Sequence, residues 1–304
     1  MEHEPSLPPK IKKDLDSPSR RDFLKKIGYL GTAVFALPLI NAIEKIPTDF
    51  SNGQENNKKY EQFIVDQINK IKEIIEAKKY GEILSNSYLA SCLYYSQSFI
   101  SKISNSKENN YVSERIIKSA AYLITPEFRK EAILELEKQT KDKELSEDTE
   151  ISVSEISPLR SFSFGKGKNH EDALDLFTEE SSPIYSMGSG LVIVADKGWD
   201  SNNETSSSSM SGGNTVIVFN YLTKEFFRYA HLDEVAVSPG ELIMEGKNLG
   251  TVGHTGKNAS LQGHGSHLHF EINKYLSDKN TNQSLSVKEL KKRLKNLKHI
   301  QTKK

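Results

Sequence analysis

Hydrophobic and polar positions follow a helical period in the first half of the chain. Four isoleucines recur at intervals of four, three and four residues, which places them on one helical face: Ile64, Ile68, Ile71 and Ile75. The same kind of pattern predicts further helices over 82–103, 112–124 and 126–141. Thr125 and Pro126 are typical of the cap and the first turn of the last of these helices. We therefore expect residues 47–145 to form a helical domain with its linker.

After residue 158 the pattern changes to that of β-strands. Runs of β-branched and aromatic residues, bounded by Gly, Pro and Ser, predict strands over 183–186, 190–195, 214–219, 226–231 and 267–272. A stretch rich in Ser and Gly, 200–213, is expected to be an exposed loop. The predicted fold class is therefore α+β: a helical N-terminal domain followed by a small, mainly antiparallel β domain over 158–274.

Two polar segments flank the predicted β domain. Residues 146–157 are acidic and serine-containing, and we expect a solvated linker there. In the tail, 275–304, Ser286 and Glu289 form a capping-box pattern before a helix with one apolar stripe and several lysines. This short basic helix either packs on the β domain or contacts an anionic envelope polymer or membrane.

The N-terminal segment, 1–46, carries a targeting pattern. Arg20 and Arg21 are followed by Asp-Phe-Leu-Lys and then by a moderately apolar run over 27–43. Paired arginines before such a run resemble the twin-arginine signal, which exports folded proteins. A buried or membrane-anchoring helix is the alternative, and the weak cleavage site at 40–42 leaves retention as an anchor open. We expect export by the twin-arginine machinery to the periplasm or cell envelope.

Composition narrows the candidate chemistry. Lys and Arg equal Asp and Glu at 41 each, so a nucleic-acid binder dominated by phosphate contacts is not expected. The balance is uneven: 1–46 carries +2, 274–304 carries +8, and the middle carries the compensating negative charge. The single cysteine, Cys92, excludes an intramolecular disulfide and a cysteine-cluster metal site. Six of the eight histidines lie between His170 and His269.

These histidines suggest a metal site. His267 and His269 share one face of a predicted strand, because alternate residues of a strand point the same way. His170 and Asp175 lie in a segment that on its own is typical of a solvated acidic turn, but they can supply one nitrogen and one oxygen ligand. Together with one strand histidine they give three protein ligands and an open position, as in a catalytic zinc site.

The ordered motifs of residues 158–274 resemble the lysostaphin-like, or LytM-type, zinc metallopeptidases of bacterial cell walls. Besides His170 and Asp175, the motifs are Pro183-Ile184-Tyr185, Gly190-Leu191-Val192, Tyr229-Ala230-His231-Leu232, Gly240-Glu241-Leu242-Ile243, Gly250-Thr251-Val252-Gly253-His254-Thr255-Gly256 and Gly265-Ser266-His267-Leu268-His269-Phe270-Glu271. The resemblance implies a fold like the duplicated hybrid motif.

The resemblance also implies residue roles. His170, Asp175 and His269 would bind one Zn2+ per chain. His267 would be the general base, and His231 would position the substrate or stabilise the oxyanion. Four residues separate His170 from Asp175 where the family often has three, a spacing at which Glu171 would fall on the ligand position. The remaining histidines of this region, His254 and His264, are expected to be structural or on the surface.

The function expected from this resemblance is that of an exported zinc-dependent endopeptidase hydrolysing peptide cross-links in the peptide stems of bacterial peptidoglycan. One alternative is a non-catalytic LytM-like regulator that binds and activates another cell-wall hydrolase. Another is a metallopeptidase acting on proteins. The helical segment, 58–142, would be an inhibitory pro-region, a docking module or a spacer. If it occludes the groove, removing residues 1–150 should raise activity.

Overall fold

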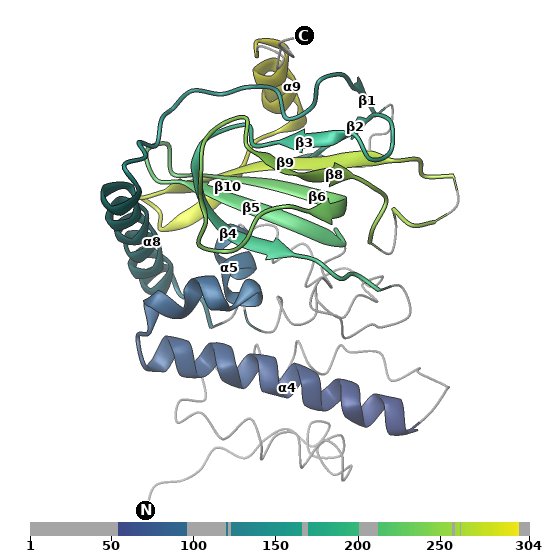
Figure 1. Ribbon diagram of the computed structural model, residues 1–304. Coiled ribbons are helices and arrows are strands. Elements are labelled where there is room, and N and C mark those ends of the chain that lie inside the picture. Colours follow the sequence, from purple (N-terminus) through teal and green to yellow (C-terminus); the bar gives the residue numbers. More distant parts are fainter. Residues whose placement is uncertain are drawn as a thin grey trace, which may run out of the picture.

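The computed structural model describes residues 54–95, 120, 123–165, 170–200, 212–256, 259–261 and 263–297. The predicted export signal, most of the predicted helix over 112–124 and most of the loop over 200–213 lie outside the described residues. Figure 1 shows the described part as one sheet with helices on both sides. Among the described helices, none combines the length and the apolar character needed to cross a bilayer.

The helical segment begins with α4 (Gln54–Glu76), which has one buried row. Val65, Ile68, Ile71 and Ile74 are buried, whereas Ile75 is only partly buried. The periodicity therefore predicts this helix correctly, but Ile74 takes the buried position expected for Ile75. Ile68, Ile71 and Ile74 of this row join the hydrophobic cluster of the next helical elements.

The helix predicted over 82–103 is wrong at its start and also ends early, at Tyr94, since Tyr95 is extended; residues 96–103 lie outside the described residues. A 3-10 helix, η1 (Tyr80–Ser85), comes first, and α5 (Ser87–Tyr94) begins only after Asn86. Asn86 is extended, and its side-chain oxygen accepts a hydrogen bond from the backbone N–H of Leu89 at 2.9 Å. An asparagine that caps a helix in this way interrupts any helix running through it.

The helix α8 (Pro126–Glu147) begins where the sequence predicts a helix cap followed by proline. Thr125 is the cap and accepts a hydrogen bond from the N–H of Phe128, while Pro126 occupies the first helical position. The helix ends at Asp148, which adopts a left-handed conformation. It runs six residues beyond the end predicted from the pattern.

The second half forms a ten-stranded antiparallel sheet. Its strands are β1 (Ser163–Phe164), β2 (Leu174–Phe177), β3 (Pro183–Tyr185), β4 (Gly190–Asp196), β5 (Asn214–Asn220), β6 (Glu225–Val235), β7 (Leu242–Ile243), β8 (Asn248–Val252), β9 (His267–Leu276) and β10 (Thr281–Ser284). The main order is β1-β2-β9-β6-β5-β4-β7, with β10 on β9 and β8 joining β3 to β6. All five predicted strands are present, and the α+β fold class is confirmed.

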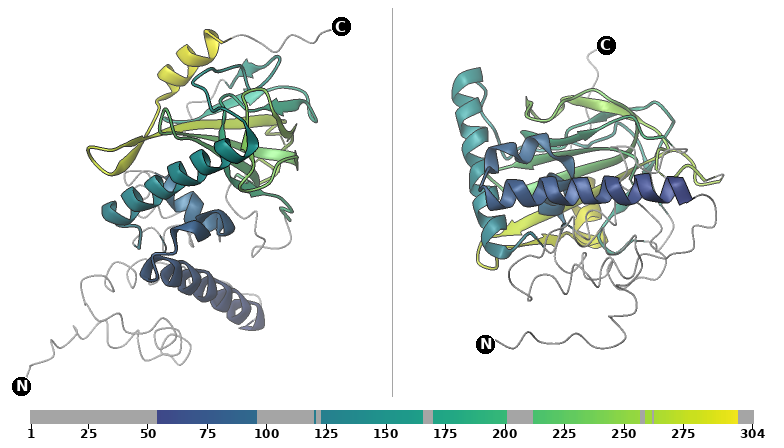
Figure 2. Two further views of the ribbon diagram at one scale, coloured as in Figure 1. Left: turned by 60° about the vertical axis from the view of Figure 1, so that its left-hand side comes forward. Right: turned by 90° about the horizontal axis from the view of Figure 1, so that it is seen from below.

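The two faces of the sheet are covered by different helices. One face packs on Leu290 and Leu294 of α9 (Val287–Lys295), which has the capping box predicted at Ser286 and Glu289. The other face packs against α5 and its neighbours, so the helical segment and the sheet share one hydrophobic cluster. Figures 1 and 2 show α5 between the sheet and α4, with α9 on the opposite side.

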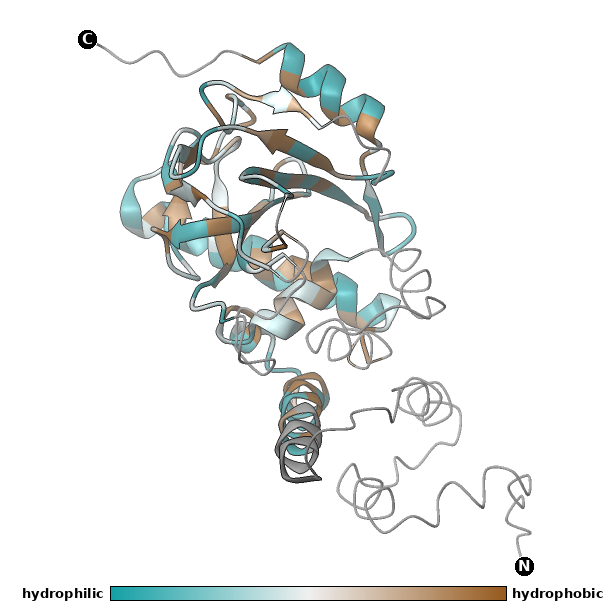
Figure 3. Ribbon diagram, turned by 90° about the vertical axis from the view of Figure 1, so that its right-hand side faces the viewer, coloured by the Kyte–Doolittle hydropathy of each residue, from teal (hydrophilic) through white to brown (hydrophobic). Residues whose placement is uncertain are grey.

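Residues 151–157 differ from the solvated linker expected there. Ile151 and Ser157 are buried, and Glu155 forms a β-bridge with Gly188. Arg293 of α9 binds Glu155 as well as Glu225 of β6. The segment is therefore part of the packed domain surface, and the basic helix is held to it by ion pairs. In Figure 3 the strands of the sheet carry both brown and teal stretches, whereas the ribbon of α9 is mostly teal.

Candidate metal centre

The strand β2 places Asp175 beside His269. The two strands β2 and β9 pair antiparallel, with Asp175 directly opposite His269 and Phe177 opposite His267. Leu174 and Leu176 of β2 point to the opposite face and join the hydrophobic core on that side of the sheet. The segment that in isolation is typical of an acidic turn is therefore a strand, and its pairing register brings a carboxylate to the histidine face.

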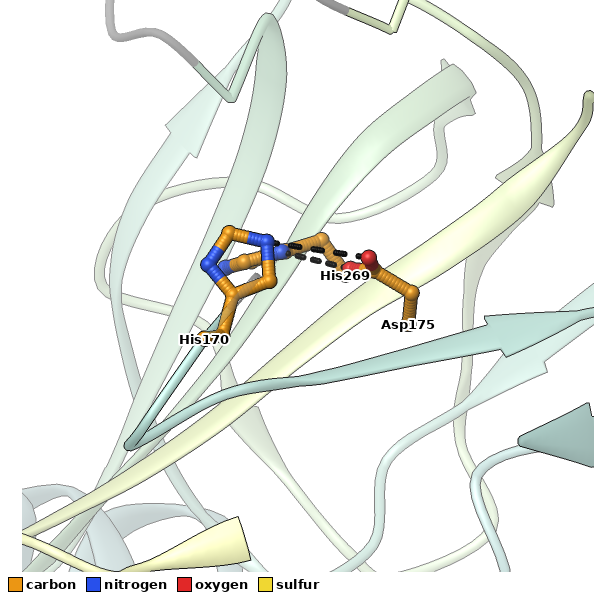
Figure 4. Close-up of side chains that lie close together, drawn as sticks. All are labelled: His170, Asp175 and His269. Carbon is orange, nitrogen blue, oxygen red and sulfur yellow. Dashed lines mark hydrogen bonds and ion pairs between the residues drawn. The ribbon is translucent and has the colours of Figure 1, made fainter. Parts of the chain in front are cut away.

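His170 completes a three-residue cluster (Figure 4). One ligand atom from each of His170, Asp175 and His269 lies within 4.8 Å of the others. Nε2 of His170 is 3.6 Å from Oδ2 of Asp175, and Nδ1 of His269 is 3.0 Å from Oδ1 of the same carboxylate. The His170 side chain is 40% exposed, so this side of the cluster is open to solvent. The longer spacing thus brings His170 into the cluster, and Glu171 is not part of the group found among the described residues.

The donor set fits zinc. Two imidazoles and one carboxylate are the ligand types and the number that catalytic zinc sites use. The second nitrogen of His269, Nε2, lies 2.7 Å from Oε1 of Glu271. A carboxylate behind a metal-ligating histidine fixes its tautomer and its ring orientation. His269 therefore has Nδ1 directed at the cluster and Nε2 directed at its supporting carboxylate.

Charges around His269 change its protonation in the metal-free chain. Burial by itself would lower the pKa of His269, but the hydrogen bonds to Asp175 and Glu271 outweigh it and raise the pKa to about 8. Burial would raise the pKa of Glu271, yet Arg228 and His269 hold it well below its usual range. Glu271 is thus an ionised carboxylate inside the protein, paired with Arg228 directly across β6 and β9.

His267 has the geometry of a neutral base. Its Nδ1 lies 2.9 Å from the carbonyl oxygen of Gly265, and because a carbonyl can only accept, Nδ1 carries the proton. Nε2 is then the free acceptor, 3.9 Å from Oδ1 of Asp175. Burial lowers the pKa of His267, which favours this neutral form. Phe177 stacks on the ring with a centroid distance of 5.0 Å and holds its plane.

His231 reaches the same face through a β-bulge. Ala230 lies opposite His269, so simple alternation would turn His231 to the other face. The register between β5 and β6 shifts at this point, and His231 has a φ of 66°. Its ring centroid is consequently 4.9 Å from that of His267. Such strain in a residue other than glycine is common beside functional sites.

The protonation of His231 follows from its partner. Nδ1 lies 2.6 Å from the carbonyl oxygen of Thr255, so Nδ1 donates and Nε2 is an acceptor in the neutral ring. Burial, together with His269 and His267, lowers the pKa of His231 well below its ordinary value. His231 can therefore donate from Nε2 to an oxyanion only after it has taken up a second proton.

The other two histidines of the region, His254 and His264, are not members of the three-residue cluster. His254 is exposed and pairs with Glu180 at 2.8 Å, and His264 is exposed as well. The sequence interpretation missed the supporting residues Glu271, Arg228 and Phe177. Glu271 could have been found, since it follows His269 by two residues on the same strand face. The other two depend on strand pairing, which the local pattern does not show.

Comparison with known proteins places this site in a family. Residues 169–284 match the model of peptidase family M23. These residues form an M23 peptidase-family domain. The M23 domain spans all five candidate site residues, from His170 to His269, and starts well after the helical segment.

Individual relatives cover less of the chain. The peptidoglycan DD-endopeptidase ShyB of Vibrio cholerae serotype O1 is 35% identical over 98 residues, which is 32% of this chain and 19% of that protein. The chain thus spans about a fifth of the length of the curated relative that it matches. Lysostaphin from Staphylococcus simulans aligns at 20% identity over 50% of this chain and 60% of its own, with a TM-score of 0.35. A zinc-containing peptidase from Vibrio cholerae aligns at 26% identity over 41% of this chain and 36% of its own, with a TM-score of 0.30.

Proposed function

We propose that the chain is an exported zinc-dependent endopeptidase that hydrolyses peptide cross-links of bacterial peptidoglycan. The observation that carries the proposal is the convergence of His170, Asp175 and His269 beside two further histidines, His267 and His231. The M23 match supports peptide hydrolysis, and the named activity of the curated relative supports peptidoglycan as the substrate. Peptide stems of the cell wall would be the bound partner.

The three cluster residues would hold one Zn2+. When bound, zinc polarises a carbonyl oxygen and makes a neighbouring water more acidic near neutral pH. His267 would take a proton from the attacking water at Nε2, because its Nδ1 is already committed to Gly265. Phe177, which stacks on the His267 ring, would keep the ring in place for that transfer.

His231 would act on the substrate side of the centre. Its neutral ring accepts at Nε2, so it would first accept a hydrogen bond from the peptide N–H or take up a proton from water. In its protonated form it would then donate to the developing oxyanion, the role that the resemblance assigns to it. The bulge at this residue supports the proposal, since it brings the ring to the face of the other site residues.

Digestion of purified peptidoglycan tests the proposal. The zinc-loaded chain should release soluble muropeptides with newly exposed stem ends, identified by mass analysis. Removal of the metal with a chelator, or the substitution His267→Ala, should abolish release. His254→Ala is the matched control, because that histidine is exposed and lies outside the cluster, and it should leave release unchanged.

Different results would overturn the proposal in different ways. A chain that binds one zinc but releases nothing from any wall preparation is not this enzyme. A chain that binds no zinc but stimulates a separate hydrolase would be a regulator. Cleavage of casein or another protein together with no release from peptidoglycan would indicate a metallopeptidase that acts on proteins.

We further propose export by the twin-arginine route to the periplasm or cell envelope, with membrane anchoring if the signal is retained. The supporting observation is the sequence pair Arg20 and Arg21 before the apolar run. Replacing both arginines with lysine should leave the protein in the cytoplasmic fraction of the host cell. Unchanged fractionation would refute this route.

A further inference from the structure

The helical segment contacts the support of the metal centre through one side chain. Tyr94, the last residue of α5, is fully buried, and its hydroxyl donates to Oε2 of Glu271. Glu271 in turn holds Nε2 of His269 at 2.7 Å. Tyr94 lies 75 residues before the start of the segment that matches the M23 family. A residue outside the M23 domain therefore touches the outer shell of its candidate site.

We propose that Tyr94 is a positioning residue for the metal ligand His269, acting through Glu271, so that the helical segment completes the metal centre. The inference rests on the proposed function in one respect, namely that the His170, Asp175 and His269 cluster holds zinc. It goes beyond that function by assigning part of the metal affinity to a helix that precedes the catalytic domain.

Glu271 is held at both oxygens. Oε1 accepts from Arg228 and lies against His269, while Oε2 accepts from Tyr94. All of these side chains are buried, so water does not compete for either oxygen. A carboxylate with both oxygens bound cannot rotate, and the direction of its bond to His269 is therefore set.

The position of Tyr94 is itself secured by side chains that bind the end of α5. Arg129 of α8 donates to the carbonyl oxygens of Cys92 and Leu93, and Asn282 of β10 donates to that of Tyr94 at 2.6 Å. The last carbonyls of a helix have no partner within the helix, so these contacts satisfy groups that would otherwise be buried and unpaired. They also join α5 to α8 and to the sheet.

Loss of the Tyr94 hydroxyl would leave Oε2 of Glu271 buried without that donor. The carboxylate would then move toward its remaining partners, and the ring of His269 would lose its fixed orientation. Residues that bond directly to a metal ligand, as Glu271 does to His269, typically contribute roughly 10- to 100-fold to metal affinity. Tyr94 acts one contact further out, so we expect a loss at the lower end of that range, about 10-fold, for Tyr94→Phe.

Tyr94→Phe removes the hydroxyl and keeps the aromatic ring, so it tests the hydroxyl alone. The Tyr94 ring packs edge-on against Tyr95 and Phe226 at centroid distances of 5.0 and 6.3 Å, and phenylalanine keeps these contacts. Tyr275→Phe is the matched control. Tyr275 is buried in the same cluster on β9, but its hydroxyl donates to Asn280 at 3.0 Å. Both variants lose one hydroxyl hydrogen bond, and only one of these bonds reaches Glu271.

Metal affinity of the full chain is the deciding measurement, by competition of Zn2+ with a chelator. Tyr94→Phe should bind zinc about 10-fold more weakly than the wild type, while Tyr275→Phe should match the wild type. The visible spectrum of the Co2+-substituted protein should change for Tyr94→Phe alone, because it reports ligand orientation. Thermal unfolding of the metal-free variants shows whether each is folded.

A double-substitution cycle with Glu271→Gln provides a second test, once thermal unfolding has shown that both single variants and the double variant are folded. If Tyr94 acts through Glu271, Tyr94→Phe should have little further effect on zinc affinity in the Glu271→Gln background. Equal zinc affinity in Tyr94→Phe and wild type, or equal losses in Tyr94→Phe and Tyr275→Phe, would overturn the positioning role alone. A wild-type chain that binds neither Zn2+ nor Co2+ would overturn the proposed function, and this inference with it.

Discussion

At the scale of single residues, the candidate site depends on how each side chain is turned toward one face. His267 and His269 share a face by strand alternation, which the sequence pattern predicts correctly. His231 shares that face only because of a bulge whose position depends on the pairing of β5 with β6. Such a bulge leaves no mark in the local pattern of polar and apolar residues, so it could not have been predicted.

The bulge leads to a prediction about His231. Its φ of 66° is unfavourable for a residue with a Cβ and acceptable for glycine. His231→Gly and His231→Ala both remove the imidazole and should both lose peptidase activity. His231→Gly should nevertheless be more stable than His231→Ala by about 1 kcal/mol in urea unfolding. Equal stabilities would mean that the backbone relaxes at this residue when the imidazole is removed.

At the scale of elements, the secondary structure of a short segment depends on the residues that it pairs with or caps. β2 has only four residues, and its acidic composition alone favours a turn, yet pairing with β9 makes it a strand. Asn86 likewise divides a region whose apolar spacing predicts one long helix. The longer elements, α4, α8 and the central strands, were predictable because each carries several turns or repeats of its own pattern.

The contact between α5 and β4 should make stability depend on pH. Asp196 at the end of β4 is partly buried, and burial raises its pKa to about 7, against a smaller opposing effect of a hydrogen bond with Ser87. Between pH 4 and 7 the folded chain therefore holds a proton that the unfolded chain has lost. The contribution of Asp196 to stability is largest at low pH and falls as the pH rises through this window.

Asp196→Asn should remove that dependence, because the amide stays neutral. Wild type should lose stability between pH 5 and pH 8 and the variant should not. The difference in free energy of unfolding, variant minus wild type, should therefore rise over this range by an amount on the order of 1–2 kcal/mol. Chemical denaturation at both pH values measures the difference. A constant difference across the range would show that Asp196 is as ionised in the folded chain as in the unfolded one.

At the scale of the whole molecule, the helices and the sheet share one hydrophobic cluster. Tyr94 and Leu93 of α5 pack with Ile193 and Phe219 of the sheet, and α8 contributes to the same cluster. The sequence indicates two segments by their different periodicities, but periodicity does not show whether two segments share a core. The boundary predicted near residue 146 separates two patterns within this packed unit.

Removal of an inhibitory pro-region would raise activity. Because the helices share a core with the sheet, we expect a different outcome when residues 1–150 are removed. The truncated chain would expose apolar residues of the sheet face and lose the Tyr94 contact to Glu271. We expect a lower melting temperature, aggregation, and weaker zinc binding, with no gain in peptidase activity. Calorimetry and a zinc-binding assay on the truncated chain measure these effects. Higher turnover in the truncated chain would favour the inhibitory role instead.

The register of β2 on β9 also predicts where the chain tolerates insertions and deletions. Asp175 meets His269 across a strand pair, so one residue added within β2 would turn the carboxylate to the opposite face. A residue added in the turn between His170 and β2 leaves that register intact, since the turn can absorb the extra length. The four-residue spacer is therefore compatible with the cluster, and variation in length should be tolerated before the strand but not inside it.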